Sequence, residues 1–427
     1  MTFLRGRDNI KDMALTEILL RRESYGGFIF HPVDATFVHL DPPAFQVVRD
    51  AFCHGLEPAD EEGAGVLRDV RAALPRPIGP VRYLDLTMEE PAPVSNLYSA
   101  PTLVDFQITD NCELACPQCY ASSRADGKHA AWEDVRLALS RMREAGVCQV
   151  AIGGGEPLRH PRFADILAEV RAHGMVPNVT TTGIGATETH LDAMAQHCGA
   201  VALSLEGVGE QFSLRRRQGF DTFREQVARI QGHGIKLVLQ ITLSADNFEQ
   251  LPDMVDYALG IQDLYGVIFL AHKPAGRATD FDSPLSARPF AEVYPPVIQA
   301  VQALRAHTQV GFDCCLSPLI TSVEQDLGFP PTGVVEGCSA TRGSLGLSVE
   351  LDCVPCTFLT DRPLGNLRRN SLLDIWRSHP SRSFRTLQAG FLQRDARCGG
   401  CAVNAVCLGG CPVWDLVGCR HAERVQN

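Results

Sequence analysis

Three cysteines in the segment 111–120 constrain this chain more than any other feature. Cys112, Cys116 and Cys119 have a C-x₃-C-x₂-C spacing and follow the apolar run 103–109. A tight loop after a strand can present three thiolates to three irons of a cubane cluster, which leaves the fourth iron free to bind a cofactor or a substrate. A zinc site remains an alternative at this point, because the thiolate spacings of zinc and iron–sulfur sites overlap.

The other cysteines show where further metal is expected. Of the 16 cysteines, ten lie between Cys314 and Cys419, and only Cys53, Cys148 and Cys198 are scattered. The chain shows neither a signal peptide nor an apolar run of membrane-spanning length, so we expect a cytoplasmic protein. Disulfide frameworks are unusual there. The clustered thiols therefore predict metal sites, and the scattered ones predict small buried apolar residues.

Length and charge narrow the remaining classes. A chain of 427 residues predicts two or three domains. The net charge of −11 argues against a general nucleic-acid binder and against a polybasic membrane patch. We therefore expect no nucleic-acid partner and no membrane association.

The N-terminal part, residues 1–90, is expected to be a small separate domain. Short strand-like runs cover 26–32 and 35–40, and helical patterns begin at Pro42 and at about Glu61. Two strands followed by two helices predict a winged-helix-like domain. Residues 91–100, within a stretch rich in Pro and Ser, are the expected linker.

The middle of the chain, residues 101–310, alternates strands with helices, a pattern that predicts parallel βα units. The expected strands are 102–109, 148–152, 176–181, 200–205, 235–243 and 265–271. Sites in such folds lie at the carboxyl ends of the strands, where the Cys112 loop also falls. The cysteine loop and the six units resemble the radical SAM superfamily, with its partial (β/α)₆ TIM-like barrel. In that family the amino and carboxylate groups of S-adenosylmethionine chelate the fourth iron.

This resemblance implies cofactor contacts at the ends of later strands. They are Gly154, Gly155, Glu156, Thr181, Ser204 and Arg217. Each has a simpler reading: a tight turn for the glycines, a helix cap for the threonine, and a solvated helix start for the arginine. Arg215 and Arg216 also remain open as the arginine that holds the cofactor carboxylate, with Arg217 preferred by its spacing to Phe223.

The chain departs from the family pattern at three positions around the predicted cofactor. Gln118 stands where an aromatic residue is usual, Glu113 where Asn is common, and Glu206 where the fourth strand normally has Asp. None of these changes removes an iron ligand, but Gln118 leaves open how the adenine is held.

Two further segments at strand ends have open roles. Asn247 is either a cofactor contact or the N-cap of the helix at Leu251, where Gln250 would complete a capping box. The polar segment 272–277 after the sixth strand either lines the substrate site or supplies structural salt bridges through Lys273 and Arg277.

The C-terminal region, residues 311–427, resembles the SPASM extension of radical SAM enzymes, which holds two auxiliary 4Fe–4S clusters. Its seven matching cysteines are Cys338, Cys356, Cys398, Cys401, Cys407, Cys411 and Cys419. The resemblance assigns the first, second and sixth of these to cluster I and the other four to cluster II. Leu351 replaces the glycine that the family has at a turn.

Cluster I needs a fourth ligand from upstream. Cys315 is the predicted ligand, with Cys314 as the alternative, and an open iron that binds a substrate thiolate as the third possibility. Two structural zinc sites would satisfy the same thiolates.

The segment 20–30 resembles the start of a RiPP recognition element, a domain that captures a leader peptide by adding it to a strand edge. A dimerisation or packing domain of the same fold is the alternative. Together these resemblances imply an oxidoreductase that uses three 4Fe–4S clusters and S-adenosylmethionine to modify a ribosomally made precursor peptide. A thioether or carbon–carbon crosslink is the expected product, and a flavodoxin or ferredoxin the expected electron donor. The competing hypotheses are a formylglycine-forming sulfatase-type maturase and a non-enzymatic metal-binding or electron-transfer protein.

Overall fold

A ten-stranded sheet dominates the computed structural model, which describes residues 17–75, 78–88, 97–326, 337–394, 398 and 400–419. Its order is β11-β10-β9-β8-β7-β6-β5-β12-β13-β14. The strands are β5 (Leu103–Thr109), β6 (Gln149–Gly154), β7 (Val176–Thr181), β8 (Val201–Leu205), β9 (Leu237–Leu243), β10 (Gly266–Ala271), β11 (Gln309–Phe312), β12 (Ser344–Leu347), β13 (Asp352–Val354) and β14 (Gly365–Asn366). From β5 to β11 every neighbouring pair is parallel, so these strands end at the same edge. The sheet is open, as in a partial barrel.

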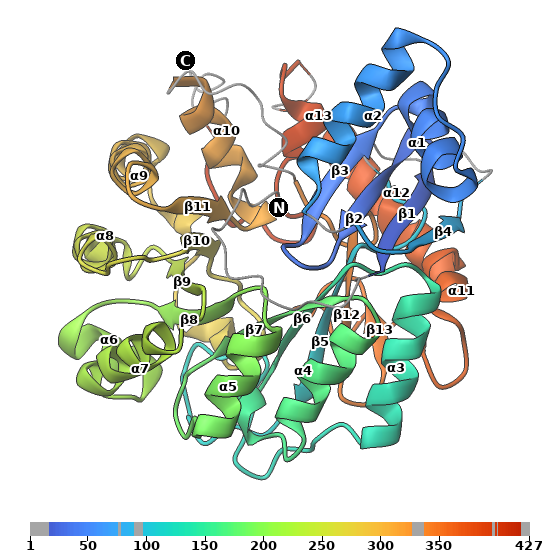
Figure 1. Cartoon of the computed structure of the whole chain (residues 1–427). Coiled ribbons are helices and arrows are strands. Elements are labelled where there is room, and N and C mark those ends of the chain that lie inside the picture. Colours follow the sequence, from blue (N-terminus) through green and yellow to red (C-terminus); the bar gives the residue numbers. More distant parts are fainter. Residues whose placement is uncertain are drawn as a thin grey trace.

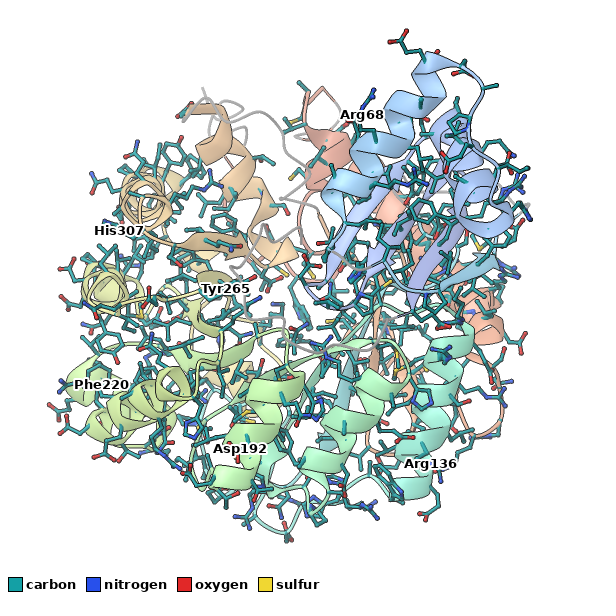
Figure 2. The ribbon with its side chains drawn as sticks, in the orientation of Figure 1. Arg68, Arg136, Asp192, Phe220, Tyr265 and His307 are labelled. Carbon is teal, nitrogen blue, oxygen red and sulfur yellow. The ribbon has the colours of Figure 1, made fainter. Side chains whose placement is uncertain are left out.

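Helices cover the outer side of this sheet (Figure 1). They are α3 (Trp132–Glu144), α4 (Phe163–Ala172), α5 (Glu188–His197), α6 (Gly209–Arg216), α7 (Phe220–Gly232), α8 (Leu251–Leu259) and α9 (Phe290–Arg305). All but α6, which buries only Phe212, bury an apolar stripe, such as Val135, Leu139 and Met142 on α3. Arg136 lies on the same helix in the outer layer (Figure 2). The predicted βα alternation is therefore confirmed.

All six predicted strands are present, and four additional strands extend the sheet, β11 on one side and β12, β13 and β14 on the other. β11 pairs in parallel with β10, and β12 pairs in parallel with β5. Each has only four residues, too few for a clear period-2 pattern. The sheet thus runs across the predicted boundary at residue 310, and the strand after Cys338 lies directly beside the strand that leads to Cys112.

The N-terminal region contains a second sheet of four strands, ordered β3-β2-β1-β4. The strands are β1 (Ile18–Glu23), β2 (Gly26–His31), β3 (Thr36–Leu40) and β4 (Val81–Asp85), and the helices are α1 (Pro42–His54) and α2 (Glu61–Ala73). Both predicted strands and both helices are present, whereas β1 and β4 were missed. β1 and β4 pair in parallel across about 60 residues of sequence, which no local pattern indicates.

Both faces of the N-terminal sheet are covered. Ile18, Leu20 and Ile29 pack against α1 and α2, whereas Phe28 and Phe30 pack with Cys148 and Val176 of the larger domain. Figure 1 shows the sheet between its own helices and the parallel sheet. β3 forms one edge of this sheet, with Thr36, Phe37 and Val38 half-buried and His39 exposed.

The remaining helices follow the parallel strands in sequence. They are α10 (Ser317–Asp326), α11 (Leu372–Trp376), α12 (His379–Arg394) and α13 (Asn404–Cys407). The predicted linker 91–100 lies largely outside the described residues. Among the helices of the described ranges, none has the length and apolar character needed to cross a bilayer.

Candidate metal and cofactor site

The three N-terminal cysteines lie on one loop at the carboxyl end of β5. The backbone of this loop is held at both ends, because Cys112 N donates to Arg124 O at 2.9 Å and Arg277 N donates to Cys119 O at 3.0 Å. The Arg277 guanidinium also donates to the carbonyls of Cys116 and Ser123. For Arg277 the structure therefore shows a structural role, although its partners are backbone carbonyls and not the acidic groups expected of a salt bridge.

The thiols of this loop are shielded from bulk solvent. Burial raises the pKa of Cys112 to about 11 and raises the pKa of Cys116. Thiols of this kind stay protonated at neutral pH unless a metal or a nearby cation stabilises the thiolate. A cation is present, because the positive charge of the Arg216 side chain interacts with the three thiols. The backbone of the same residue is also close, since the Cys116 Sγ donates to the Arg216 carbonyl oxygen at 3.1 Å.

The glycines at the carboxyl end of β6, Gly154 and Gly155, are required by the close approach of two backbone segments. Gly154 has a φ of +121°, and a Cβ added there would lie 2.1 Å from Thr109 O. A Cβ on Gly155 would lie 2.2 Å from Asn111 O. Gly155 N and Glu156 N donate to these two carbonyls at 2.6 and 2.7 Å. The glycine segment thus fixes the residues that enter the cysteine loop.

Glu156 joins the ends of two neighbouring strands. Its buried carboxylate accepts hydrogen bonds from the hydroxyls of Thr181 and Thr182 and from the N–H groups of Thr182 and Leu158. Burial raises the pKa of Glu156, and these donors oppose the shift. Both carboxylate oxygens are occupied, so this side chain orders the site, and the backbone of the segment is what remains available to a cofactor.

The three consecutive arginines have different environments. Arg215 forms an ion pair with Asp282, and Arg217 is exposed with a φ of +54° at the end of α6. Only Arg216 turns toward the cysteines. Although burial lowers it, the pKa of Arg216 is raised above its ordinary value by Glu206 and by the three thiols of the loop. The geometry therefore favours Arg216 over Arg217 as the cofactor-binding arginine.

Two of the departures from the family pattern contact each other. The Gln118 side-chain amide donates to Glu206 Oε2, and Arg216 Nη1 donates to Glu206 Oε1 at 3.3 Å. Within the described residues, the buried atoms Gln118 Oε1 and Arg216 Nε have no hydrogen-bond partner. Unpaired buried polar atoms beside three thiols are what a site for a polar cofactor requires. The donor set thus fits an iron–sulfur cluster with S-adenosylmethionine beside it.

Other predicted positions are less informative. Ser204 lies half-buried near the end of β8, opposite Gln240 of β9.

Asn247 accepts from Ser244 N and Oγ and donates to Thr242 O, so it stabilises its own turn. It caps only the short 3₁₀ turn Phe248–Gln250 and makes no side-chain cap bond, so the predicted capping box is wrong. Glu113 forms an ion pair with Arg159 at 3.5 Å.

Five cysteines converge in the first C-terminal group. The pKa of Cys314 is lowered by hydrogen bonds from Cys315 and Cys338, and the pKa of Cys315 is raised by its contacts with Cys314 and Cys411. Cys356 lies in the same cluster as Cys314 and Cys338. Cys314 contacts Cys338 and lies in one cluster with Cys356, and it also packs against the main hydrophobic core. Cys315, 3% exposed, is part of that core and contacts Cys411. Four thiols suffice for a cubane cluster, so one of the five is surplus.

Cys398, Cys401, Cys407 and Cys419 form the second C-terminal group. Burial and then the proximity of the other three thiols raise the pKa of Cys407 to about 12. The seven matching cysteines therefore divide in space as the resemblance implies. Leu351 occupies a left-handed conformation with a φ of +64°, which confirms that its turn favours glycine. Of the scattered cysteines, Cys148 is buried, while Cys53 and Cys198 are half-buried.

Two contacts that join the Cys112 loop to the first C-terminal thiol group were not predicted from the sequence. Tyr120, next to Cys119, packs against Phe358, two residues after Cys356, with ring centroids 4.1 Å apart and the ring planes tilted by 31°. Asp105 of β5 accepts a hydrogen bond from Thr357 Oγ1 at 2.9 Å. The only hint was one carboxylate within the apolar run of β5.

Comparison with known families supports this division of the chain. The profile of the Radical SAM superfamily matches residues 106–258, and the SPASM iron–sulfur cluster-binding domain matches residues 338–402. The radical SAM domain binds S-adenosylmethionine and a 4Fe–4S cluster, and the SPASM domain binds auxiliary iron–sulfur clusters. The matches identify an enzyme that combines both domains.

The chain is also similar to individual proteins. It is 25% identical over 336 residues to the PqqA peptide cyclase of Xanthomonas euvesicatoria pv. vesicatoria (strain 85-10), which covers 73% of this chain and 85% of the relative. In fold it is similar to SuiB of Streptococcus suis, with a TM-score of 0.67, 16% identity, and coverage of 92% and 94% of the two chains. The enzyme anSMEcpe with bound AdoMet gives a TM-score of 0.57 at 15% identity, with coverage of 72% and 89%.

Proposed function

We propose that this radical SAM/SPASM enzyme modifies a ribosomally made precursor peptide, by forming a thioether or carbon–carbon crosslink within it. The observation that carries the proposal is the spatial order of the thiols. Three lie on the β5 loop, a second group includes Cys356, two residues before Phe358, whose ring contacts Tyr120 of that loop, and four thiols form a third group. This order separates a cofactor-binding cluster from clusters that can accept the electron left on the product.

The chain's own residues bind and orient the cofactors. Cys112, Cys116 and Cys119 would hold the first cluster. Arg216 would meet the carboxylate of S-adenosylmethionine, since it is the one of the three consecutive arginines whose charge interacts with all three thiols. The backbone at Gly154–Gly155 would lie beside the amino group. When bound, the cofactors supply a 5′-deoxyadenosyl radical that removes a hydrogen atom from an unactivated carbon.

Two relatives support a peptide as the substrate. The similar cyclase from Xanthomonas is named for the peptide PqqA, and SuiB has a structure bound to its precursor peptide SuiA. The fold likeness to SuiB extends over 92% of this chain, and so includes most of the N-terminal domain.

The N-terminal domain would receive the leader of the precursor. β3 is an edge strand with half-buried Phe37 and Val38, and its outward backbone groups can pair with an added strand. We therefore assign leader binding to the segment 26–40, while the core of the peptide enters the open end of the parallel sheet. A flavodoxin or ferredoxin would supply the electron.

The proposal is tested with anaerobically reconstituted protein and the short peptide encoded by the neighbouring reading frame. We expect about twelve irons per chain, cleavage of S-adenosylmethionine under dithionite, and a product lighter by two hydrogen atoms. Zinc without cofactor cleavage would instead indicate a metal-binding scaffold.

The leader is tested separately. A peptide without its leader should bind more weakly and turn over more slowly, and deletion of residues 1–90 should have the same effect. If neither change alters affinity or turnover, leader recognition by this domain is wrong. Conversion of a Cys or Ser in a short leaderless peptide to formylglycine would favour the sulfatase-type alternative.

A further inference from the structure

A buried ion pair lies beside the first C-terminal thiol group and has no part in the chemistry described so far. Lys273 follows β10, and Asp313 follows β11 directly. These strands are neighbours in parallel register, with Phe269 opposite Phe312, so their ends bring the two charges together. The Lys273 Nζ contacts Asp313 Oδ2, and the two side chains are only 5% and 10% exposed.

Asp313 connects this pair to the cysteines. Its other oxygen, Oδ1, accepts a hydrogen bond from Cys315 N at 3.0 Å and so caps the 3₁₀ turn Cys314–Leu316. The Asp313 carboxylate and the sulfurs of Cys314 and Cys315 all lie within 4.8 Å of one another. The negative charge of Asp313 is therefore placed directly against thiols that would carry negative charge in a cluster.

Lys273 is also in contact with the opposite side of the group. Its Nζ lies 4.4 Å from the centroid of the Phe358 ring, which packs against Tyr120. Phe358 is two residues from Cys356, so the cation lies between the loop of Cys356 and the turn of Cys314. An ammonium over an aromatic face is held in place by the ring quadrupole.

Such an arrangement has a physical cost. Burying two charges is at best neutral for stability compared with apolar residues, so a buried pair is weak evidence for a stabilising role. Electrostatic effects are large at a site of low dielectric. The net charge around an iron–sulfur cluster is one of the factors that set its reduction potential.

We propose that Lys273 sets the reduction potential of auxiliary cluster I by offsetting the negative charge of Asp313 beside the cluster thiolates. The inference rests on the proposed function, because it requires a cluster at Cys338, Cys356 and Cys411. Without the cation, the carboxylate would face the cluster alone, which disfavours the reduced state and lowers the potential.

The test measures the midpoint potential of the auxiliary clusters by electron paramagnetic resonance during a redox titration. The full-length protein is used with Cys112, Cys116 and Cys119 changed to Ala, so that only auxiliary signals remain. We expect Lys273→Met to lower the ratio of reduced to oxidised cluster I at least tenfold at a fixed potential, which corresponds to 59 mV for a one-electron couple.

A second variant separates charge from packing. Lys273→Met combined with Asp313→Asn restores the net charge, and we expect its midpoint to return close to that of the unaltered pair. Asp313→Asn alone should raise the midpoint, which keeps the inference testable if Lys273→Met fails to bind iron. Lys236→Met is the matched control, because the Lys236 ammonium lies 5.1 Å from the ring centroid of Tyr265 at the other end of the parallel strands (Figure 2).

An unchanged midpoint in both single variants would overturn the inference, as would a double variant shifted as far as Lys273→Met. Failure of the proposed function gives a different result. In that case the protein with Lys273 and Asp313 intact binds no auxiliary iron–sulfur cluster, and both conclusions fall together.

Discussion

At the scale of single residues, Asp105 shows how strongly the interior of the parallel sheet perturbs a side chain. Burial raises the pKa of this carboxyl group to about 6, although the hydroxyl of Thr357 donates to it. The same burial and the charge of Asp105 raise the pKa of Tyr120. A carboxyl group at this depth costs stability whenever it is ionised.

We expect Asp105→Asn to stabilise the protein at pH 8 by about 2–3 kcal/mol and to have little effect at pH 4. The folded pKa of Asp105 is above the unfolded value of 3.8. At a pH between these two pKa values, the folded state binds one proton more than the unfolded state does. The stability of the unchanged protein therefore falls as the pH rises from about 4 to 6. Thermal unfolding of both proteins across this range measures the difference. A gain of equal size at both pH values would contradict the explanation, and Asp126→Asn, at the surface, serves as the control.

The surplus thiol gives a second prediction at this scale. Cys314 lies with two of the other predicted ligands, Cys338 and Cys356, whereas Cys315 contacts Cys411 and is more deeply buried in the core. Cys314→Ala should therefore remove the fourth ligand of cluster I. Cys315→Ala should keep the full iron content and lose only core packing, at a cost of about 1 kcal/mol. Iron analysis and electron paramagnetic resonance distinguish the two variants. The reverse result would restore Cys315 as the ligand, and loss of iron in neither would indicate that each replaces the other.

At the scale of elements, the turn after β6 is positioned by contact with the turn after β5. The glycines predicted from the sequence to approach the cofactor also approach Thr109 and Asn111 of the neighbouring strand end. The cysteine loop therefore depends on a segment about 40 residues further along the chain. A local pattern identified the glycines, but only the register of β5 and β6 explains their contact.

We expect Gly155→Ala to displace the cysteine loop, because its Cβ would lie 2.2 Å from Asn111 O. The variant should lose about four irons and reduce cofactor cleavage on the order of 100-fold. Gly153→Ala is the matched control, since the nearest atom to its added Cβ, Asp105 Oδ1, is 4.0 Å away. Equal activity of the two variants would show that the loop does not depend on this contact.

At the scale of the whole molecule, a buried arginine fixes the N-terminal domain against the parallel sheet. Arg21 is fully buried, forms an ion pair with Glu23, and donates to the carbonyls of Ala100, Pro101 and Gly146. Its guanidinium also lies 4.7 Å from the centroid of the Phe28 ring. The interface thus depends on a buried ion pair and on hydrogen bonds from its arginine to backbone carbonyls of the parallel-sheet domain. It sets a fixed distance between the proposed leader site and the cysteine loop.

We expect Arg21→Met to destabilise the protein by about 3–5 kcal/mol, because it leaves Glu23 buried and unpaired. Adding Glu23→Gln should recover much of this loss. The surface pair Arg22–Asp85, with side chains 47% and 42% exposed, is the control, and Arg22→Met should cost less than about 1 kcal/mol. Chemical unfolding measures all three variants, and equal losses for Arg21→Met and Arg22→Met would show that the interface does not depend on the buried charge.

The sequence by itself determined the three cysteine groups, the six strands that support the first of them, and the helices between those strands. These features depend on local spacing: thiols a few residues apart can share a metal, and periodic apolar residues form one face of an element. The relation to the radical SAM and SPASM domains follows from the same short motifs.

Only the tertiary structure decided which side chains act together. Arg216 instead of Arg217 faces the thiols, Gln118 meets Glu206, and Lys273 meets Asp313. Each of these contacts joins segments that follow different strands, and the partners are from 40 to about 100 residues apart in sequence. Such contacts depend on the order and register of the strands in the sheet, which no local pattern contains.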